Sequence, residues 1–280
     1  MRPDGGLRTA WRALILPVLA LGLAALGPAC SRVDTYKARL DAVAEDEGRT
    51  ALRDTLWAQG SLYRWADHHN VQFTVRWTTF TPLAATPSDE VWLLDTAGGK
   101  FRLEVPSKNL VTLFNGWSWR FFAGGKPLED LAACERLSGV ARVAQELAPM
   151  PFSLLGPGLD IRSMGTATGP GEARAWQRLL VAYSAAGGRS VHDRMVVEIR
   201  DSTHRVEAAQ VRWAELPFAS RAYRVEMDEW HEHNGLVLAH RYRFYWADEK
   251  GAATGPIRFE LRVMDVALDV PEKWGAFSQP

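Results

Sequence analysis

Residues 71–78 (VQFTVRWT) decide the fold class, because apolar and polar side chains alternate along this stretch without a break. A period of two is typical of a β-strand with one face in a core and the other in water. The residues before Val71 follow a helical spacing instead. The change of period therefore marks the point at which a sheet begins.

The same alternation recurs downstream, with turn sequences between the segments. Asn115-Gly116 and Asn234-Gly235 are typical of two-residue hairpin turns, and a longer turn contains Gly98-Gly99. Helical segments are too few for βαβ crossovers, so the sheet is predicted to be antiparallel. We expect about eleven strands, at residues 71–78, 91–94, 101–105, 110–114, 117–122, 176–184, 195–200, 206–213, 222–233, 236–246 and 257–266.

Two segments are predicted to be helical and amphipathic. Residues 33–63 carry apolar side chains on one face, in two helices that meet near Gly48. Residues 127–148 carry an apolar stripe that Pro149 and Pro151 bring to an end, and residues 165–171 are predicted to be an exposed connection. Long antiparallel sheets curl. The prediction is a mainly β (α+β) domain, a curved antiparallel half-barrel with helices covering its concave face.

The N-terminus has the pattern of a secretory signal peptide. Arg2, Arg8 and Arg12 precede the apolar run at residues 13–27, and small residues follow it. A membrane-spanning helix needs about 20 apolar residues, so this run is short for that role, although a membrane-anchoring helix is the alternative. We therefore predict a signal peptide at residues 1–29 and a single mature half-barrel domain at residues 30–280.

The sequence Gly27-Pro28-Ala29-Cys30-Ser31 resembles the lipobox of bacterial lipoproteins, in which the cysteine becomes the lipidated first residue. It departs from that pattern at Gly27, where leucine is usual, and at Pro28. Cleavage after Ala29 by an ordinary signal peptidase is the alternative. The resemblance implies a membrane anchor at Cys30, and Ser31 is compatible with sorting to the outer membrane. Several acyl chains would make that anchor stable.

Charge and composition exclude one class of partner. Lys plus Arg and Asp plus Glu both number 33, and removal of residues 1–29 leaves a net charge of about −2. The mature chain thus has no electrostatic footprint for nucleic acid. The 12 Trp residues indicate either a Trp-rich core and sheet surface or an aromatic-lined cavity. Cys134 lies on a helical apolar stripe and is expected to be a buried small hydrophobe.

The hairpin turn at Asn234-Gly235 places Glu229, His231, His233 and His240 on one strand face. Imidazole and carboxylate groups could bind Zn²⁺ there, so the three histidines are weak metal candidates. Leucines among them favour a solvated mixed face instead, and we predict no metal and no cofactor. The sequence has no nucleophile elbow, zinc-protease helix or phosphate loop, and no catalytic residue is predicted.

A set of apolar residues is predicted to face the hollow of the curved sheet and to line a ligand cavity. The alternative is that the same side chains form a closed core against the helices. A single β-bulge would invert any such face assignment. The set is Val71, Phe73, Val75, Trp77, Trp92, Leu94, Phe101, Leu103, Trp117, Trp119, Phe121, Tyr242, Phe244, Trp246, Phe259 and Leu261.

The order of elements and several phrases resemble the lipoprotein-localisation factor (LolA/LolB-like) superfamily and its uncharacterised outer-membrane lipoprotein relatives. The resemblance covers roughly residues 45–280. It implies a half-barrel covered by helices and a site for acyl chains, and no individual binding residue carries over. The phrases are Val91-Trp92-Leu93, residues 99–104 (GKFRLE), 115–119 (NGWSW), 228–238 (DEWHEHNGLVL), His240-Arg241 and 266–271 (VALDVP) to Phe277.

These observations together predict a non-enzymatic, exported lipoprotein of the bacterial cell envelope. We expect it in the outer membrane, facing the periplasm, and carrying an acyl chain or another hydrophobic ligand. One alternative is a structural or partner-binding lipoprotein with a closed core and an unknown protein partner. A lesser alternative is a hydrolase whose active-site residues are scattered along the sequence.

Overall fold

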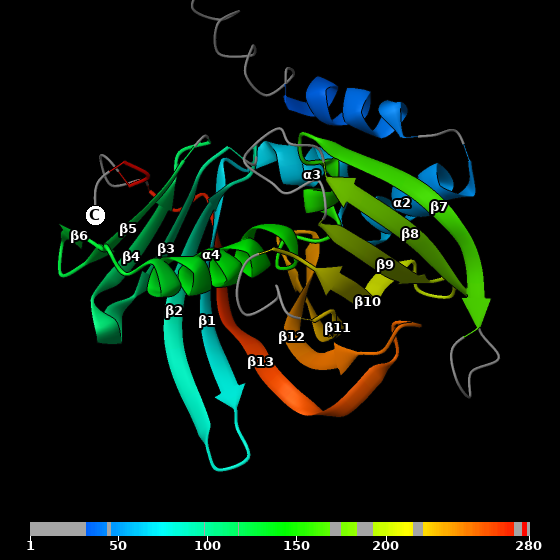
Figure 1. The fold of residues 1–280 in the computed structure, drawn as a ribbon. Coiled ribbons are helices and arrows are strands. Elements are labelled where there is room, and N and C mark those ends of the chain that lie inside the picture. Colours follow the sequence, from blue (N-terminus) through cyan, green and yellow to red (C-terminus); the bar gives the residue numbers. More distant parts are fainter. Residues whose placement is uncertain are drawn as a thin grey trace, which may run out of the picture.

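The computed structural model describes residues 32–43, 46–97, 99–116, 118–168, 175–183, 193–214, 221–271 and 276–278. Its body is one curved antiparallel sheet in which 13 described strands follow the order β6-β5-β4-β3-β2-β1-β13-β12-β11-β10-β9-β8-β7 (Figure 1). The sheet is open, with β6 and β7 as its edge strands. The predicted signal peptide and Cys30 lie outside the described residues.

The first half of the sheet is a meander that runs outward from its centre. Neighbouring strands pair residue for residue, for example Phe73 with Trp92, Trp92 with Leu103 and Leu103 with Thr112. The strands are β1 (Asn70–Phe80), β2 (Ala85–Asp95), β3 (Phe101–Val105), β4 (Leu110–Phe114), β5 (Trp119–Ala123) and β6 (Lys126–Pro127).

The second half returns from the other edge, so the last strand lies beside the first. Val71 pairs with Leu268 and Phe73 with Val266, which joins the two halves along β1 and β13. The strands are β7 (Leu159–Thr168), β8 (Ala175–Tyr183), β9 (Arg194–Arg200), β10 (Arg205–Arg212), β11 (Tyr223–His233), β12 (Leu236–Ala247) and β13 (Ala253–Leu268).

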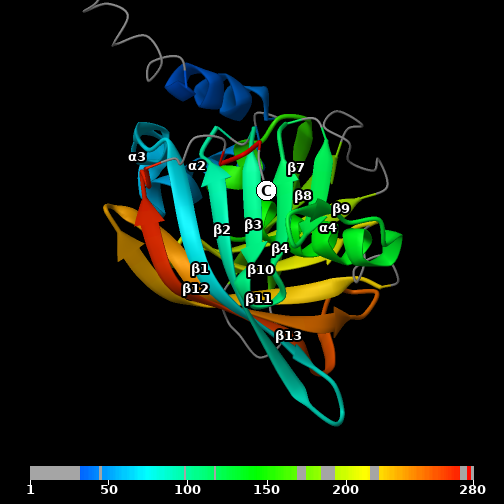
Figure 2. The ribbon, with the colours of Figure 1, turned by 90° about the vertical axis from the view of Figure 1, so that its left-hand side faces the viewer.

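Helices lie at the top of the sheet and against its concave face (Figures 1 and 2). Residues 32–42 form the first helix, followed by α2 (Glu47–Ala58), α3 (Ser61–Asp67) and, after the first half-sheet, α4 (Leu131–Glu146). Side-chain caps start two of them: Asp46 accepts hydrogen bonds from Gly48 N and Arg49 N, and Asp130 accepts one from Ala133 N. Short 3₁₀ turns occupy Pro106–Lys108 and Phe152–Leu155.

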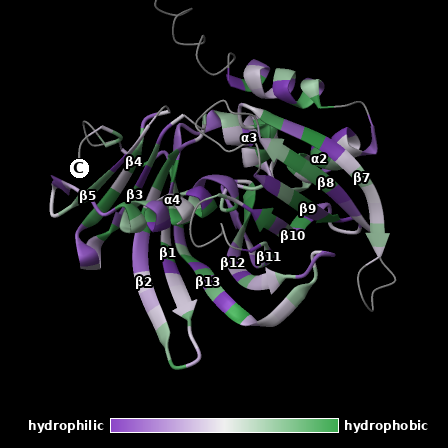
Figure 3. Cartoon of the chain, in the orientation of Figure 1, coloured by the Kyte–Doolittle hydropathy of each residue, from purple (hydrophilic) through white to green (hydrophobic). Residues whose placement is uncertain are grey.

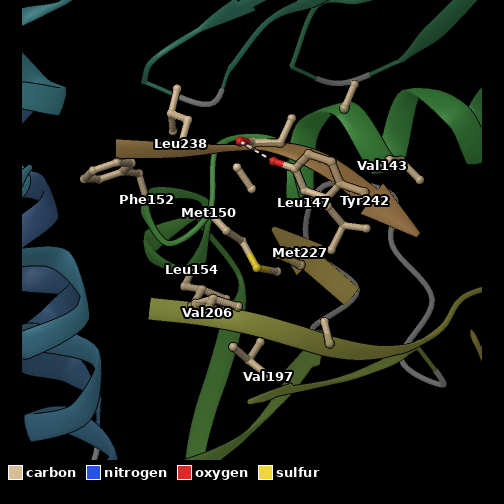
Figure 4. Packing of buried hydrophobic residues seen from close by; sticks show 14 of the residues in the cluster. Val143, Leu147, Met150, Phe152, Leu154, Val197, Val206, Met227, Leu238 and Tyr242 are labelled. Atoms are coloured by element: carbon tan, nitrogen blue, oxygen red, sulfur yellow. Dashed lines mark hydrogen bonds between the residues drawn. The ribbon is translucent and has the colours of Figure 1, made fainter. Parts of the chain in front are cut away.

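Hydrophobic and hydrophilic residues alternate along many of the strands (Figure 3), and the hydrophobic ones form the buried core. Val71, Phe73 and Val75 are fully buried, whereas Gln72 and Thr74 between them are partly exposed. The residues after α4 enter this core, where Tyr242 donates a hydrogen bond to Ala148 O at 3.3 Å (Figure 4). Burial of this apolar face is the main favourable contribution to folding.

Gln59, at the end of α2, joins the helices to both the core loop and the sheet. Its side-chain amide donates to Met150 O at 3.3 Å and to Val237 O at 3.1 Å. Its side-chain oxygen accepts from Val206 N at 3.4 Å, and its backbone oxygen accepts from Val237 N at 3.0 Å. The residue is fully buried, so these bonds are made where water cannot replace them.

The fold class predicted from the sequence is confirmed, with local corrections. The described sheet has 13 strands rather than about eleven, because β6 and β7 were missed. The predicted exposed connection at 165–171 begins within β7, which continues to Thr168. The central helix begins at Leu131 rather than at residue 127, since β6 takes Lys126–Pro127. Cys134 is partly rather than fully buried. In the part of the chain that the structure describes, no helix is long and apolar enough to cross a membrane.

Candidate functional site

A cavity of about 210 Å³ lies at the top of the half-barrel, between the covering helices and the sheet. The first helix contributes Tyr36 and Arg39, and α4 and the loop after it contribute residues from Ser138 to Pro157. The ends of β2, β4 and β5 form one side, and Leu159 and Met195 come from the opposite half of the sheet. An engineered apolar cavity of about 150 Å³ admits benzene, so this space suits a ring or a short stretch of acyl chain.

One wall of the cavity is apolar because it continues the buried face of the sheet. Leu94 is 5% exposed. Phe114 and Trp119 are partly buried, with their ring centroids 4.8 Å apart. Trp119 also meets Phe101 edge-on at 6.2 Å. Aromatic pairs of this kind hold their rings in place, so the apolar wall is preformed.

The opposite wall carries charge that is buried. Arg142 and Glu146, one turn apart on α4, are 4% and 5% exposed and line the cavity. Arg142 Nε donates to Glu146 Oε1 at 2.9 Å, and its Nη1 donates to Asp193 Oδ2 at 2.6 Å. The guanidinium also lies 4.7 Å from the ring centroids of Tyr183 and Trp213. Tyr183 Oη donates to Glu146 as well.

This network fixes α4 to the second half of the sheet. Asp193 precedes β9 and its Oδ1 accepts a hydrogen bond from Ala214 N at 2.8 Å. A buried arginine is stable only when carboxylates and oriented rings replace its water. The charged wall is therefore built by long-range contacts of α4 and not by α4 alone.

The first helix covers the cavity with Tyr36 and Arg39, and α3 supports the residues around them. Tyr36 Oη and Trp65 Nε1 both donate to Thr96 O, the latter at 3.2 Å. Trp65 stacks on Phe152 with centroids 4.8 Å apart and an interplanar angle of 2°. Arg39 Nη1 donates to Leu155 O at 2.8 Å. These contacts tie the roof to the loop after α4 and to the β2–β3 turn.

The C-terminal segment supports the rim formed by the β2–β3 and β4–β5 turns. Arg102 Nη1 donates to Ala276 O at 3.0 Å, and Arg120 Nη2 donates to Ser278 O at 2.9 Å. Phe277 between them is 7% exposed. Lys100 is a residue of the cavity lining, and its Nζ lies 5.9 Å from the Phe277 ring centroid.

The residues predicted to line a cavity divide into four groups. Leu94 and Trp119 line the cavity found at the top, and Trp117 lies outside the described residues. Phe121, Trp246 and Phe259 are partly buried. The others are core residues at most 5% exposed: Val71, Phe73, Val75, Trp77, Trp92, Phe101, Leu103, Tyr242, Phe244 and Leu261. Sequence reasoning missed the charged lining residues Arg39, Lys100, Arg142 and Glu146 altogether.

The predicted histidine cluster exists as a stack of rings on β11 and β12. The ring centroids of His231 and His240 are 4.3 Å apart, and those of His233 and His240 are 5.0 Å apart. Glu229 lies opposite His240 by register but has a φ of 55°, which takes it out of the ladder. No group of His, Cys, Asp or Glu within the described ranges could hold a metal ion.

Hydrogen bonds fix the protonation of two of these rings. His240 Nδ1 lies 3.0 Å from Val263 O, a carbonyl that can only accept, so Nδ1 carries the proton. His240 Nε2 is then the acceptor for His233 Nε2, at 2.8 Å. Burial, with the nearby His231 and His233, lowers the pKa of His240 to about 4. Burial and His231 also lower the pKa of His233.

A second buried ionisable group, Glu90, lies on β2 away from the cavity lining. It is 5% exposed, and its Oε2 accepts a hydrogen bond from Trp92 Nε1 at 2.8 Å. Burial raises the pKa of Glu90 to about 7, against the opposing effects of Trp92 and Lys108. The carboxyl group is therefore largely protonated in mildly acidic solution.

Comparison with known proteins identifies the fold. No protein-family model matches the sequence, and no curated protein matches it either. Among solved structures, a LolA superfamily protein from Nitrosomonas europaea superimposes with a TM-score of 0.56 at 11% identity, covering 82% of this chain and 97% of that one. The fold is LolA-like.

Two further structures have the same LolA-like fold. A domain from Vibrio parahaemolyticus, named for outer membrane lipoprotein sorting, gives a TM-score of 0.53 at 8% identity and covers 82% of this chain and 96% of its own. A DUF1329 family protein from Desulfovibrio piger gives 0.51 at 8% identity, with coverage of 89% and 97%. The resemblance seen in the sequence is thus confirmed for the fold.

Proposed function

We propose that this LolA-like protein is a non-catalytic carrier that binds the hydrophobic part of an acyl or lipid ligand in the cavity at the top of the half-barrel. The observation that carries the proposal is the preformed apolar wall of Leu94, Phe114 and Trp119, which faces the cavity of about 210 Å³. Each Å² of apolar surface buried there would contribute about 25 cal/mol to binding. The shared fold with a domain named for lipoprotein sorting supports the same class of ligand.

The proposal includes an envelope location. Residues 1–29 would direct export, and Cys30 would carry the lipid that holds the domain beside a membrane, the outer membrane being the expected one. Metabolic labelling with a radioactive fatty acid tests this directly. Label should enter the wild-type protein and be absent from Cys30→Ser. Equal labelling of both proteins, or no labelling of either, would contradict the proposed lipid anchor at Cys30.

The carrier role is tested first on protein purified without refolding. Mass spectrometry of organic extracts should find a co-purifying lipid, and a fluorescent fatty acid should bind the delipidated domain with saturation. A preparation that is free of lipid and fails to bind the probe would contradict the carrier role. It would favour the partner-binding alternative, which crosslinking in native membranes would then address.

A cavity-filling variant locates the binding site. Ser138 on α4 lines the cavity, so Ser138→Trp should occupy the space and weaken probe binding about tenfold or more. Glu135→Trp is the matched control, because residue 135 is exposed on the same helix. It should bind the probe like wild type. Equal binding by Ser138→Trp and wild type, with both folded by circular dichroism, would place the ligand elsewhere.

A further inference from the structure

The charges around the cavity carry an inference about the head group of the ligand. Among the residues that the structure describes, three cations line it, Arg39, Lys100 and Arg142, together with the two carboxylates Asp95 and Glu146. A third carboxylate, Asp193, is bonded to Arg142 from behind the lining at 2.6 Å. Positive and negative groups thus balance, unlike a site for an anion, in which cations are in excess.

The most deeply buried of these charges are already bonded to each other. Arg142 is 4% exposed, and its hydrogen bonds go to the carboxylates of Glu146 and Asp193. An anionic head group placed here would meet Glu146, and a cationic one would meet Arg142. Both would bring into a buried site a charge that the wall does not neutralise, which is costly in a low-dielectric environment.

Two serines of the lining, Ser138 and Ser153, favour a ligand that donates hydrogen bonds. Ser138 Oγ donates to Cys134 O at 3.0 Å, and Ser153 Oγ donates to Glu146 O at 2.7 Å. Each hydroxyl has one proton and two lone pairs. Because each hydroxyl proton is donated to a backbone carbonyl, each serine oxygen can only accept a hydrogen bond from a ligand. Hydroxyl or amide N–H groups suit such acceptors.

We infer that the cavity selects amphiphiles whose head group is uncharged and bears hydroxyl or amide donors, over carboxylate or ammonium amphiphiles of equal chain length. This inference rests on the proposed carrier function and specifies the class of ligand. The apolar wall holds the chain, and the charge-balanced wall of Arg142, Glu146 and the serines holds the head. When all the ligands have an alkyl chain of the same length, differences in their affinity report on the head group alone.

Isothermal titration calorimetry of the delipidated protein at pH 8 with three twelve-carbon ligands tests the inference. The ligands are monododecanoylglycerol, dodecanoate and dodecylammonium, each below its micelle concentration. Monododecanoylglycerol should bind about tenfold tighter than either ion. Tighter binding of dodecanoate or dodecylammonium, or equal binding of all three, would overturn the head-group inference and leave the carrier function standing. No binding of any ligand would instead contradict the carrier function.

A charge-removing variant makes the test specific to the cavity. Asp95→Asn removes one lining carboxylate yet keeps the side-chain oxygen that accepts from Ala97 N at 3.1 Å. It should raise the affinity for dodecanoate about threefold or more relative to monododecanoylglycerol. Asp89→Asn, an exposed change on the same strand beside Arg76, is the control and should leave the ratio unchanged. An unchanged ratio in Asp95→Asn would also contradict the inference.

Discussion

At the scale of single residues, Arg142 forms buried ion pairs with two carboxylates, one on α4 and one before β9. Replacement by methionine keeps an apolar stem but leaves Glu146 and Asp193 as buried carboxylates without their cation. We expect Arg142→Met to lower the free energy of unfolding by about 3–5 kcal/mol, measured by urea denaturation. Arg136→Met on the exposed side of α4 is the control, expected within about 0.5 kcal/mol of wild type. A similar small effect at Arg142 would mean that the network is not stabilising.

The histidine stack should make stability depend on pH. The pKa of His240 is lowered to about 4 in the folded protein, against about 6.5 in an unfolded chain. The unfolded state therefore binds the proton first, so this contribution to stability is complete above about pH 6.5 and is lost as the pH falls toward 4. Glu229 and Asp265 oppose the shifts of His240 and His233 respectively.

The test is the difference between wild type and His240→Gln. Unfolding free energies at pH 7.5, 6 and 5 should fall less steeply in the variant, because one histidine that must remain neutral has been removed. NMR titration of the ring protons of His240 gives its pKa independently. Parallel pH profiles for the two proteins would show that His240 is not responsible.

Glu90 should make stability depend on pH in the direction opposite to that of His240. Its folded pKa of about 7 is raised above the ordinary value of 4.5, so stability is lost as the pH rises from about 4.5 through 7. Glu90→Gln keeps an acceptor for Trp92 Nε1 and removes the ionisation. We expect the variant to be more stable than wild type at pH 8, by up to about 3 kcal/mol, and near wild type at pH 5. A loss of stability at both values would contradict the raised pKa.

The residues of the candidate site were hard to predict for a physical reason. Arg142 is buried in the middle of α4, but its partner Asp193 lies 51 residues further along the chain. Lys100 and Arg39 come from a turn and from the first helix, and only folding brings them to one cavity. Leu94 and Trp119 were predictable because strand alternation alone directs them inward.

At the scale of elements, the junction of α2 and α3 packs tightly against the β11–β12 hairpin. Gly60 has a φ of 117°, and an added Cβ would lie 2.2 Å from Gly235 O. Gly125 also has a positive φ, of 75°, but nothing lies within 4 Å of an added Cβ there. Comparing substitutions at Gly60 and Gly125 therefore separates two contributions to the loss of stability. One is the strain of a positive φ in a residue with a Cβ, and the other is the steric overlap found only at Gly60.

We expect Gly125→Ala to cost about 1–2 kcal/mol, from conformation alone. Gly60→Ala should cost about 2 kcal/mol or more beyond that, since the chain must move to relieve the overlap. Thermal or urea unfolding of both variants measures the difference. Equal costs would show that the α2–α3 junction can shift away from the hairpin freely.

The elements that the sequence did not predict have weak local signals. β6 is a two-residue strand that includes Pro127, a residue depleted in strands, so it pairs through its position beside β5. β7 contains Gly165, where the register with β8 shifts between Ser163 and Thr166. A bulge of this kind breaks the period of two. Long unbroken alternation, as in β1, is what made the remaining strands predictable.

At the scale of the whole molecule, the scarcity of helical segments between the strands predicted the antiparallel sheet, and its length predicted the curvature. The order of strands was not deducible in the same way. Hairpin turns predict neighbours that adjoin in sequence, but nothing local indicates that β1 pairs with β13. The position of the cavity depends on that pairing too, because it sets how the two halves of the sheet face each other beneath the first helix and α4.

The pairing of β1 with β13 has a consequence for how the protein is made. A ribosome produces β1 first among the strands and β13 last. Until synthesis is complete, one side of β1 offers its backbone N–H and C=O groups to any other strand within reach. Nascent copies are thus most prone to associate with each other before their final segment emerges, and a holding chaperone would be most useful during that interval.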